Sequence, residues 1–511
     1  MPKTNAKGLS PSVTLDRDSH RPLYLQLVDS LRASVENGTL EMGTRLASTR
    51  KLASDWGVSR NTVIQTFNVL ISDGYITSRT GDGTYVSDAT TPPGTAAQTN
   101  SETTASYPFR GLSRRGRRLV VKRAIGVPER PLPFMPDVPD LREFPMRSWL
   151  RLLNEVSGGL TGNALAVASS MGYLPLRKAI SHHVSVTRGL PCSADQVIIT
   201  TGSTQGLDLV IRLLTDRGDP VWMEDPGYVG TRAALVANGC NLQPVPVDGD
   251  GLHVETAIAN CLSPKLVAVS PARQYPLGTV LSKARRKRLL DFAEKTGAWI
   301  LEDDYDSEVY YDGPPPRALS TERGNDRIVF LGTFSKTLVP SLRLGYLIVP
   351  PDLGEHFANA RVNSQGHAPL LEQMVLAEMM NRGLYAAHVR RMRVLYRERQ
   401  TALAQALAET LDYRVPKREL TAGMHLVLPL VPSVSDAEIA LQLLDKRVVT
   451  RPLSPYFTGS PAQQGLLLGF AAFNPESIWE ATNRLAALGH HISRAGSHLD
   501  RVTPPTGRRN P

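Results

Sequence analysis

The feature of this 511-residue chain that most constrains its fold is a series of five short apolar runs. They occupy residues 197–200, 220–223, 266–269, 298–301 and 328–331. Helix-length segments separate the runs, and this alternation is typical of buried parallel strands. The sequence therefore predicts an α/β domain in which a mostly parallel sheet is flanked by helices.

Polar and reactive side chains follow these runs along the chain, and they include Ser203, Tyr228, Tyr275, Asp303 and Lys336. Ligands of open α/β sheets bind beyond the carboxyl ends of the strands, where such residues gather. We therefore expect these side chains to share one site.

Lys336 is the most informative of them. It follows the run 328–331, with Thr333, Ser335 and Arg343 nearby. A lysine in this setting suits a Schiff base to pyridoxal 5′-phosphate (PLP), and Asp303 would keep the pyridine nitrogen protonated. Tyr305 would hydrogen-bond the ring hydroxyl. The alternative is a surface lysine and a solvated acidic loop, which also contains Asp306 and Glu308.

Two further loops add candidate cofactor contacts. Ser203 and Thr204 stand at a strand-to-helix junction, where backbone N–H groups and hydroxyls bind phosphate. An ordinary helix N-cap is an equally good interpretation of these residues. Tyr228 would stack on a planar ring, although Pro-Gly-Tyr is also a common turn. The loop 271–278, which contains Tyr275, would close the site.

The composition excludes several classes of protein. The sequence contains no run of eighteen apolar residues, so it predicts no membrane span, and residues 1–18 do not resemble a signal peptide. The three cysteines lack metal-ligand spacing, so we expect free thiols in the cytoplasm and no metal site. The net charge of +10 comes mainly from arginines in residues 107–130 and 494–511. These arginines are either simply solvated or bind phosphates non-specifically.

The N-terminal ninety residues predict a separate domain. Helices are expected over residues 22–37 and 49–56, and a third begins after Ser59. Its inner face would carry Val63, Phe67, Leu70 and Ile71, and its outer face Asn61, Gln65 and Asn68. Residues 75–79 and 84–87 would form a hairpin wing. This is the helix-turn-helix arrangement, with a small structural bundle as the alternative.

The motifs Leu-Ala-Ser-Thr-Arg-Lys-Leu-Ala (46–53), Val-Ser-Arg-Asn-Thr-Val (58–63) and Gly-Asp-Gly-Thr-Tyr-Val (81–86) resemble the GntR-type winged helix. The resemblance implies contacts with double-stranded DNA from Arg50, Ser59, Arg60, Asn61, Thr62, Gln65, Arg79 and Gly83. Residues 17–88 hold eight basic and eight acidic residues, so binding would depend on placed contacts.

The region 134–492 resembles the fold-type I, aspartate-aminotransferase-like PLP proteins, which have a smaller C-terminal α+β subdomain. The resemblance implies a Schiff base at Lys336, Asp303 on the pyridinium, Tyr305 on O3′ and Tyr228 stacked on the ring. Ser203, Thr204, Thr333 and Arg343 would surround the phosphate. Two departures concern the substrate: Tyr275 stands where an asparagine is usual, and the strand 465–470 lacks the arginine that holds a substrate carboxylate.

The order of these parts resembles the MocR/GabR family of PLP-dependent transcription regulators. Composition and patterning along the chain predict a disordered segment 1–18, a winged helix 19–88, a flexible Arg-rich linker 89–133, the large domain 134–492 and a disordered tail 493–511. The resemblance implies a cytoplasmic homodimer on direct-repeat operators, which controls PLP or amino-compound metabolism and responds to PLP or a PLP-reactive amine. The alternatives are an active aminotransferase with a DNA-binding appendage and a repressor whose large domain only dimerises.

Overall fold

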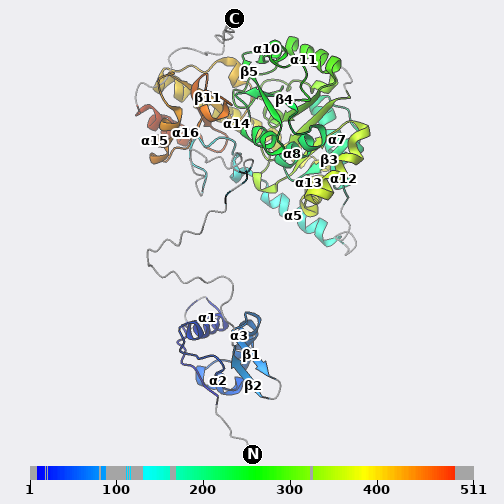
Figure 1. The fold of residues 1–511 in the computed structure, drawn as a ribbon. Coiled ribbons are helices and arrows are strands. Elements are labelled where there is room, and N and C mark those ends of the chain that lie inside the picture. The colour runs from blue at the N-terminus through cyan, green and yellow to red at the C-terminus, as the bar shows by residue number, and fades with distance from the viewer. Residues whose placement is uncertain are drawn as a thin grey trace, which may run out of the picture. The chain divides into compact units, whose positions relative to one another are not determined.

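The structure is a computed structural model that describes residues 8–17, 19, 21–79, 82–87, 111, 113, 116, 130–160, 169–322 and 326–488. The chain divides into two compact units, Met1–Phe109 and Arg110–Pro511, each with its own core (Figure 1). No helix in the described residues is long and apolar enough to cross a membrane.

The N-terminal unit contains three helices and a hairpin. The helices are α1 (Leu23–Glu36), α2 (Thr49–Trp56) and α3 (Arg60–Ser72), and the strands are β1 (Ile76–Arg79) and β2 (Gly83–Val86). The side chains of Ser48 and Ser59 cap α2 and α3, and Gly57 ends α2 in the left-handed conformation. β1 and β2 pair antiparallel, which gives the expected winged-helix arrangement.

Two expectations for this unit were wrong. Ile71 is 41% exposed, because a helix turns 100° per residue and so places it about 80° from Val63, beyond the buried face. Part of the segment expected to be disordered is ordered: Leu9 pairs with Leu46 as a parallel bridge. The indole of Trp56 donates to the carbonyl of Pro11 at 2.8 Å, and Val13 packs on the core, so residues 8–17 belong to the fold.

The large unit is built on an eight-stranded sheet. Its spatial order is β3 (Val197–Thr200), β10 (Gly345–Ile348), β9 (Ile328–Thr333), β8 (Trp299–Asp304), β7 (Leu266–Val269), β4 (Pro220–Asp225), β5 (Asn241–Asp248) and β6 (Gly251–Leu252). All five predicted runs are strands of this sheet. Only β10 and β6 run antiparallel to their neighbours, so the sheet is mostly parallel as expected.

Helices cover the sheet, and their apolar residues form separate clusters with its strands. They are α5 (Met146–Gly158), α7 (Leu174–Arg188), α8 (Ser203–Leu214), α9 (Val229–Asn238), α10 (Val254–Asn260), α11 (Lys283–Thr296), α12 (Gly354–Gln365) and α13 (Leu370–Asn381). The strands β3, β7, β9 and β10 are almost entirely buried, whereas β5 near the edge of the sheet is largely half-buried or exposed. Burial on both faces explains the continuous apolar runs of the inner strands.

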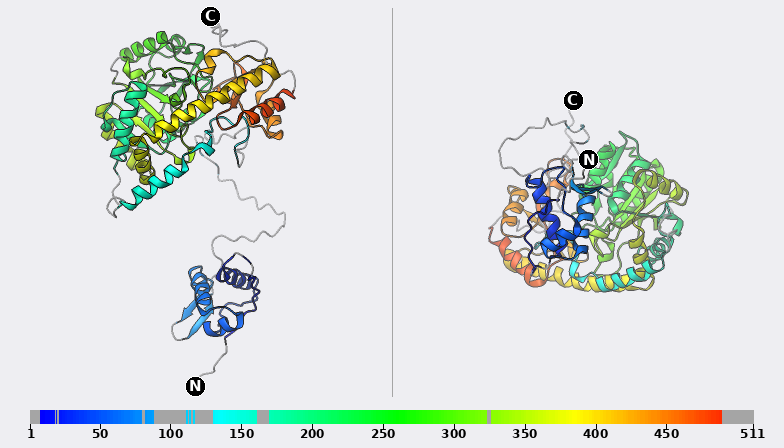
Figure 2. Two further views of the ribbon diagram at one scale, coloured as in Figure 1. Left: turned by 180° about the vertical axis from the view of Figure 1, so that it is seen from behind. Right: turned by 90° about the horizontal axis from the view of Figure 1, so that it is seen from below.

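A smaller sheet forms the C-terminal part of this unit. Its order is β11 (His425–Leu430), β13 (Gln464–Gly469) and β12 (Arg451–Pro452), with helices α15 (Asp436–Asp445) and α16 (Pro475–Ala486). The long helix α14 (Leu384–Leu411) runs from the large sheet to this part, as Figure 2 shows in yellow. It contributes Tyr385 to the core of the first and Leu403 to the core of the second.

The predicted tail 493–511 and most of the predicted Arg-rich linker lie outside the described residues. The predicted domain boundaries therefore remain predictions.

Candidate functional site

The predicted site residues converge at the carboxyl ends of β8 and β9. These strands are parallel neighbours, with Asp303 opposite Leu331, so the loops that follow them lie together. Lys336 is close enough for its charge to act on Asp303. Its Nζ atom lies 2.9 Å from Oδ1 of Asp137.

Asp303 belongs to a group of four carboxylates with Glu302, Asp304 and Asp306. Asp304 pairs with Arg188 at 2.7 Å, Asp306 pairs with Arg273 at 3.2 Å, and Glu302 accepts a backbone N–H. Within the part of the chain that the structure describes, Asp303 is the only one of the four with neither a hydrogen bond nor an ion pair.

This difference changes the electrostatics of Asp303. Burial, with added repulsion from Asp304 and Asp306, raises the pKa of Asp303 to about 7. Asp303 lines a small cavity together with Tyr228, Thr231 and Ser270. Asp303 is therefore an acid whose charged form lacks a partner and would be stabilised by a cation placed beside it.

Three predicted tyrosines form one aromatic cluster. The ring of Tyr275 lies 5.7 Å from that of Tyr228 and 5.5 Å from that of Tyr305, both nearly perpendicular to it. The hydroxyl of Tyr275 donates to Asp137 at 2.7 Å. The hydroxyl of Tyr305 is buried and has no hydrogen-bond partner among the described residues. A buried unpaired hydroxyl is unfavourable unless a ligand supplies its partner.

The remaining predicted contacts gather at the start of α8. Ser203 is its first residue, Thr204 is exposed beside it, and no side chain caps the helix. The guanidinium of Arg343 lies close to Gly202, where an added Cβ would be 3.4 Å from its Cζ atom. Arg343 itself has a φ of +50°. An uncapped helix start with an adjacent arginine is suited to an anion.

Thr333 is the last residue of β9 and Ser335 directly precedes Lys336. The Ser335 N–H donates to the Thr333 hydroxyl at 3.2 Å. The structure therefore brings the residues expected around Lys336 to one end of the large sheet.

Two residues that the sequence did not single out lie at this site. Oδ2 of Asp137 is 2.6 Å from the Nη1 atom of Arg451, and its Oδ1 contacts Lys336. Arg451 comes from β12, opposite Leu467 of β13, so the strand next to β13 supplies an arginine that β13 itself lacks. Burial opposes the charge of Asp137, but Lys336 and Arg451 outweigh it and hold its pKa well below the ordinary range.

Buried groups without a predicted role also surround the cluster. Burial raises the pKa of Glu224 to about 8 and lowers that of His425 to about 4, so both are mostly neutral near pH 7. Nε2 of His425 donates to the carbonyl of Pro276 at 2.9 Å. The charged groups around the cluster therefore include Lys336, Asp137, Arg451 and Asp303, with Arg343 at the start of α8.

The predicted DNA contacts lie on the surface of the N-terminal unit. Arg50, Ser59, Arg60, Asn61 and Gln65 are exposed on α2 and α3 or the turn between them, and Thr62 is half-buried. Gly83 begins the second strand of the wing, and Arg45 lies against it. The side chain of Arg79 lies outside the described residues.

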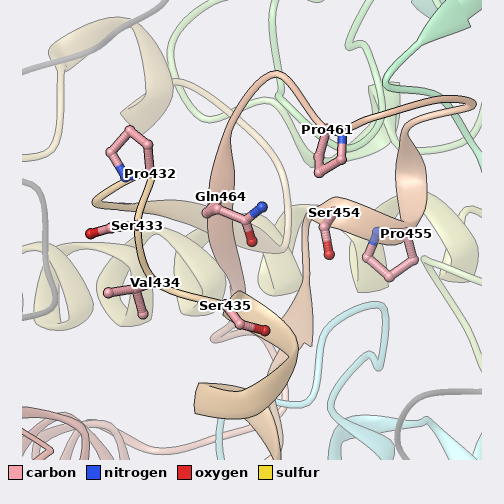
Figure 3. Close-up of a pocket in the computed structure, with 8 residues that line it drawn as sticks. All are labelled: Pro432, Ser433, Val434, Ser435, Ser454, Pro455, Pro461 and Gln464. Atoms are coloured by element: carbon pink, nitrogen blue, oxygen red, sulfur yellow. The ribbon is translucent and has the colours of Figure 1, made fainter.

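A separate hollow lies beside the start of α15 (Figure 3). Prolines, serines, a valine and a glutamine line it. The nearby carboxylate of Asp436 is buried and accepts from the hydroxyl and N–H of Ser454. This hollow contains none of the predicted site residues and no titratable lining group.

Comparisons with known proteins match both units. Residues 138–485 match the family "Aminotransferase class I and II", and residues 23–86 match "Bacterial regulatory proteins, gntR family". The chain is 39% identical to the probable rhizopine catabolism regulatory protein MocR of Rhizobium meliloti, covering 96% of this chain and 99% of that protein. It is 30% identical to the pyridoxine biosynthesis regulator PdxR of Corynebacterium glutamicum, covering 90% and 94%.

Among solved structures, the α-aminoadipate aminotransferase LysN of Thermus thermophilus superimposes with a TM-score of 0.65 at 27% identity. The match covers 74% of this chain and 96% of that one, which was solved with N-(5′-phosphopyridoxyl)-L-leucine. The large unit therefore has the aminotransferase fold, whose members bind PLP derivatives. The chain belongs to the MocR-type transcription regulators, in which a GntR-family winged helix precedes an aminotransferase class I and II domain.

Proposed function

We propose that this regulator binds PLP at Lys336 and senses PLP or a PLP-reactive amine through its large domain. The observation that carries the proposal is that Asp303 and the buried Tyr305 hydroxyl have no hydrogen-bond or ion-pair partner among the described residues, although the charge of Lys336 acts on Asp303. A pyridinium nitrogen would give Asp303 a hydrogen-bond donor, and a phenolate oxygen would give the Tyr305 hydroxyl an acceptor. The same chain carries a GntR-family DNA-binding domain, so ligand binding and DNA binding belong to one molecule.

The residues fit PLP in the following way. Lys336 would hold the aldehyde carbon covalently, Asp303 would face the pyridine nitrogen, and the Tyr305 hydroxyl would donate to O3′. Ser203, Thr204 and the N–H groups at the start of α8 would hold the phosphate with Arg343. Bound PLP supplies an aldehyde that condenses with amines and an electron sink. Tyr228 would stack on the ring and exclude water from it.

The combination of a GntR-family domain and an aminotransferase domain in one chain supports a regulatory use of this chemistry. The effector changes the conformation of the large domain, and this repositions the winged helices of a homodimer on direct-repeat DNA. Coupling of about 1–3 kcal/mol between the two sites is sufficient to change DNA affinity by 5- to 150-fold. The regulated genes belong to PLP or amino-compound metabolism.

The test is footprinting on the DNA upstream of the protein's own gene and its neighbours, with and without PLP. We expect wild-type protection to shift or strengthen with PLP, and Lys336→Ala to lose both the shift and the PLP absorbance. Lys287→Ala removes an exposed lysine of α11 and serves as the matched control. PLP binding and a ligand response that both survive in Lys336→Ala would refute the proposal.

A second function is supported by the cluster itself, since Lys336, Asp303, Tyr305 and Tyr228 also suit an aminotransferase. The 2-aminoadipate transaminase of Thermus thermophilus is 31% identical to this chain over 332 residues. Multiple turnovers with an amino donor and a keto acid would establish this activity. A single stoichiometric reaction with the donor would favour the sensor.

A further inference from the structure

Asp137 stands out within the site because of its backbone. Its φ is +68°, a left-handed conformation that few residues other than glycine adopt. Such strained residues cluster at functional sites, where the surrounding structure holds them. In this position Asp137 directs its carboxylate at Lys336 and Arg451.

The segment that carries Asp137 is fixed on both sides. The N–H of Val449 donates to the carbonyl of Pro133 at 2.9 Å, and that of Gly469 donates to the carbonyl of Phe134 at 2.8 Å. On the other side, the buried carboxylate of Asp140 pairs with Arg399 at 2.7 Å. The carboxylate of Asp137 is therefore preorganised before any ligand arrives.

Its two oxygens have different partners. Oδ2 accepts from Arg451 at 2.6 Å and from the Tyr275 hydroxyl at 2.7 Å. PLP forms a covalent bond with neither of these groups. Oδ1 accepts from Nζ of Lys336 at 2.9 Å. If Lys336 held PLP covalently, Oδ1 would lose this ammonium donor while Oδ2 stayed anchored. An effector amine that replaced Lys336 on PLP would release the lysine as a neutral amine, which is a weaker donor than an ammonium. The site then presents one ionised, unpaired acceptor beside the reactive position.

We propose that Asp137 selects the effector: it favours amines with a hydroxyl or second ammonium group next to the reacting nitrogen and disfavours α-carboxylates. A hydroxyl or ammonium donates to Oδ1, whereas a carboxylate meets a like charge at close range, which is strongly unfavourable in a partly buried site. Arg451 does not offset this repulsion, because it is already paired with Asp137 at 2.6 Å. The inference rests on the proposed function and names the ligand class of that same site.

The test uses three probes with one carbon skeleton: (S)-2-amino-1-propanol, 1,2-diaminopropane and L-alanine. They are titrated into the PLP-loaded protein, and binding is followed by the absorbance of bound PLP and by footprinting. We expect the amino alcohol and the diamine to bind at least about tenfold more tightly than alanine. One close charge contact can account for a difference of this size. Asp137→Asn should shift this ratio toward alanine by about tenfold or more for the same reason.

Two further variants complete the design. Asp137→Gly suits the left-handed backbone, so it removes the carboxylate without adding backbone strain at that position. Asp312→Asn is the matched control, because Asp312 also pairs with an arginine, Arg397, but is exposed. This control should keep the wild-type ratio.

The outcomes separate the two proposals. Wild-type protein that takes up no PLP would refute the proposed function. Three results would overturn the inference alone, each with normal PLP uptake. Alanine binds as tightly as the other two probes or more tightly, or no probe binds. In the third, the binding ratio is the same in both Asp137 variants as in the wild type.

Discussion

At the scale of single residues, two tyrosines that follow β8 show how the site differs from the surrounding core. The hydroxyl of Tyr310 donates to the carbonyl of Ala272, whereas the buried hydroxyl of Tyr305 has no partner among the described residues. Tyr310 is buried and Tyr305 half-buried, and of these two hydroxyls the one of Tyr305 lacks a partner. An unpaired buried hydroxyl lowers the stability of the PLP-free protein by about 1–3 kcal/mol.

This contrast predicts opposite effects of one substitution at the two positions. Tyr305→Phe should raise the free energy of unfolding of the PLP-free protein by about 1 kcal/mol and weaken PLP binding. Tyr310→Phe should lower that free energy by about 1 kcal/mol, because it leaves the Ala272 carbonyl unpaired. Urea unfolding without PLP and PLP titration by absorbance measure the two effects. A loss of stability in PLP-free Tyr305→Phe would contradict the assignment.

At the scale of elements, α3 depends on its first residue. The Ser59 side chain accepts from the Thr62 N–H at 3.1 Å and so satisfies one of the free donors at the start of the helix. Ser59→Ala should destabilise α3 by about 1 kcal/mol and speed amide exchange in it about fivefold. Hydrogen exchange by mass spectrometry on the whole chain measures this. Ser54→Ala, at an exposed position inside α2, should leave exchange unchanged; equal exchange in both variants would exclude a capping role.

Elements that are encoded by neighbouring residues could be predicted from the sequence, whereas elements that depend on distant contacts could not. The helix 49–56 and the strand 266–269 match α2 and β7 because caps and apolar runs are encoded within a few residues. The sequence did not predict the antiparallel strand β10, since its direction depends on pairing with β3 and β9. Asp137 lies 199 residues from Lys336 in sequence, so no local pattern reveals their contact.

At the scale of the whole molecule, the charge of the chain is concentrated away from its winged helix. Residues 17–88 hold equal numbers of acidic and basic residues, whereas residues 107–130 hold eight basic residues and one acid. Affinity for DNA that depends on phosphate contacts falls steeply with salt, because each contact releases a counterion. The salt dependence of binding therefore reports which part of the chain contacts phosphates.

The last prediction uses this dependence. Serine in place of Arg114, Arg115, Arg117 and Arg118 should reduce the slope of log affinity against log salt by about 2–4 on non-specific DNA, since each phosphate contact contributes about 0.9. Serine in place of Arg501, Arg508 and Arg509, which follow the large domain, should leave the slope unchanged. Fluorescence anisotropy with labelled duplex at several salt concentrations measures both. An unchanged slope in the first variant would mean that these arginines are only solvated, and that the neutral winged helix holds DNA through its own placed contacts.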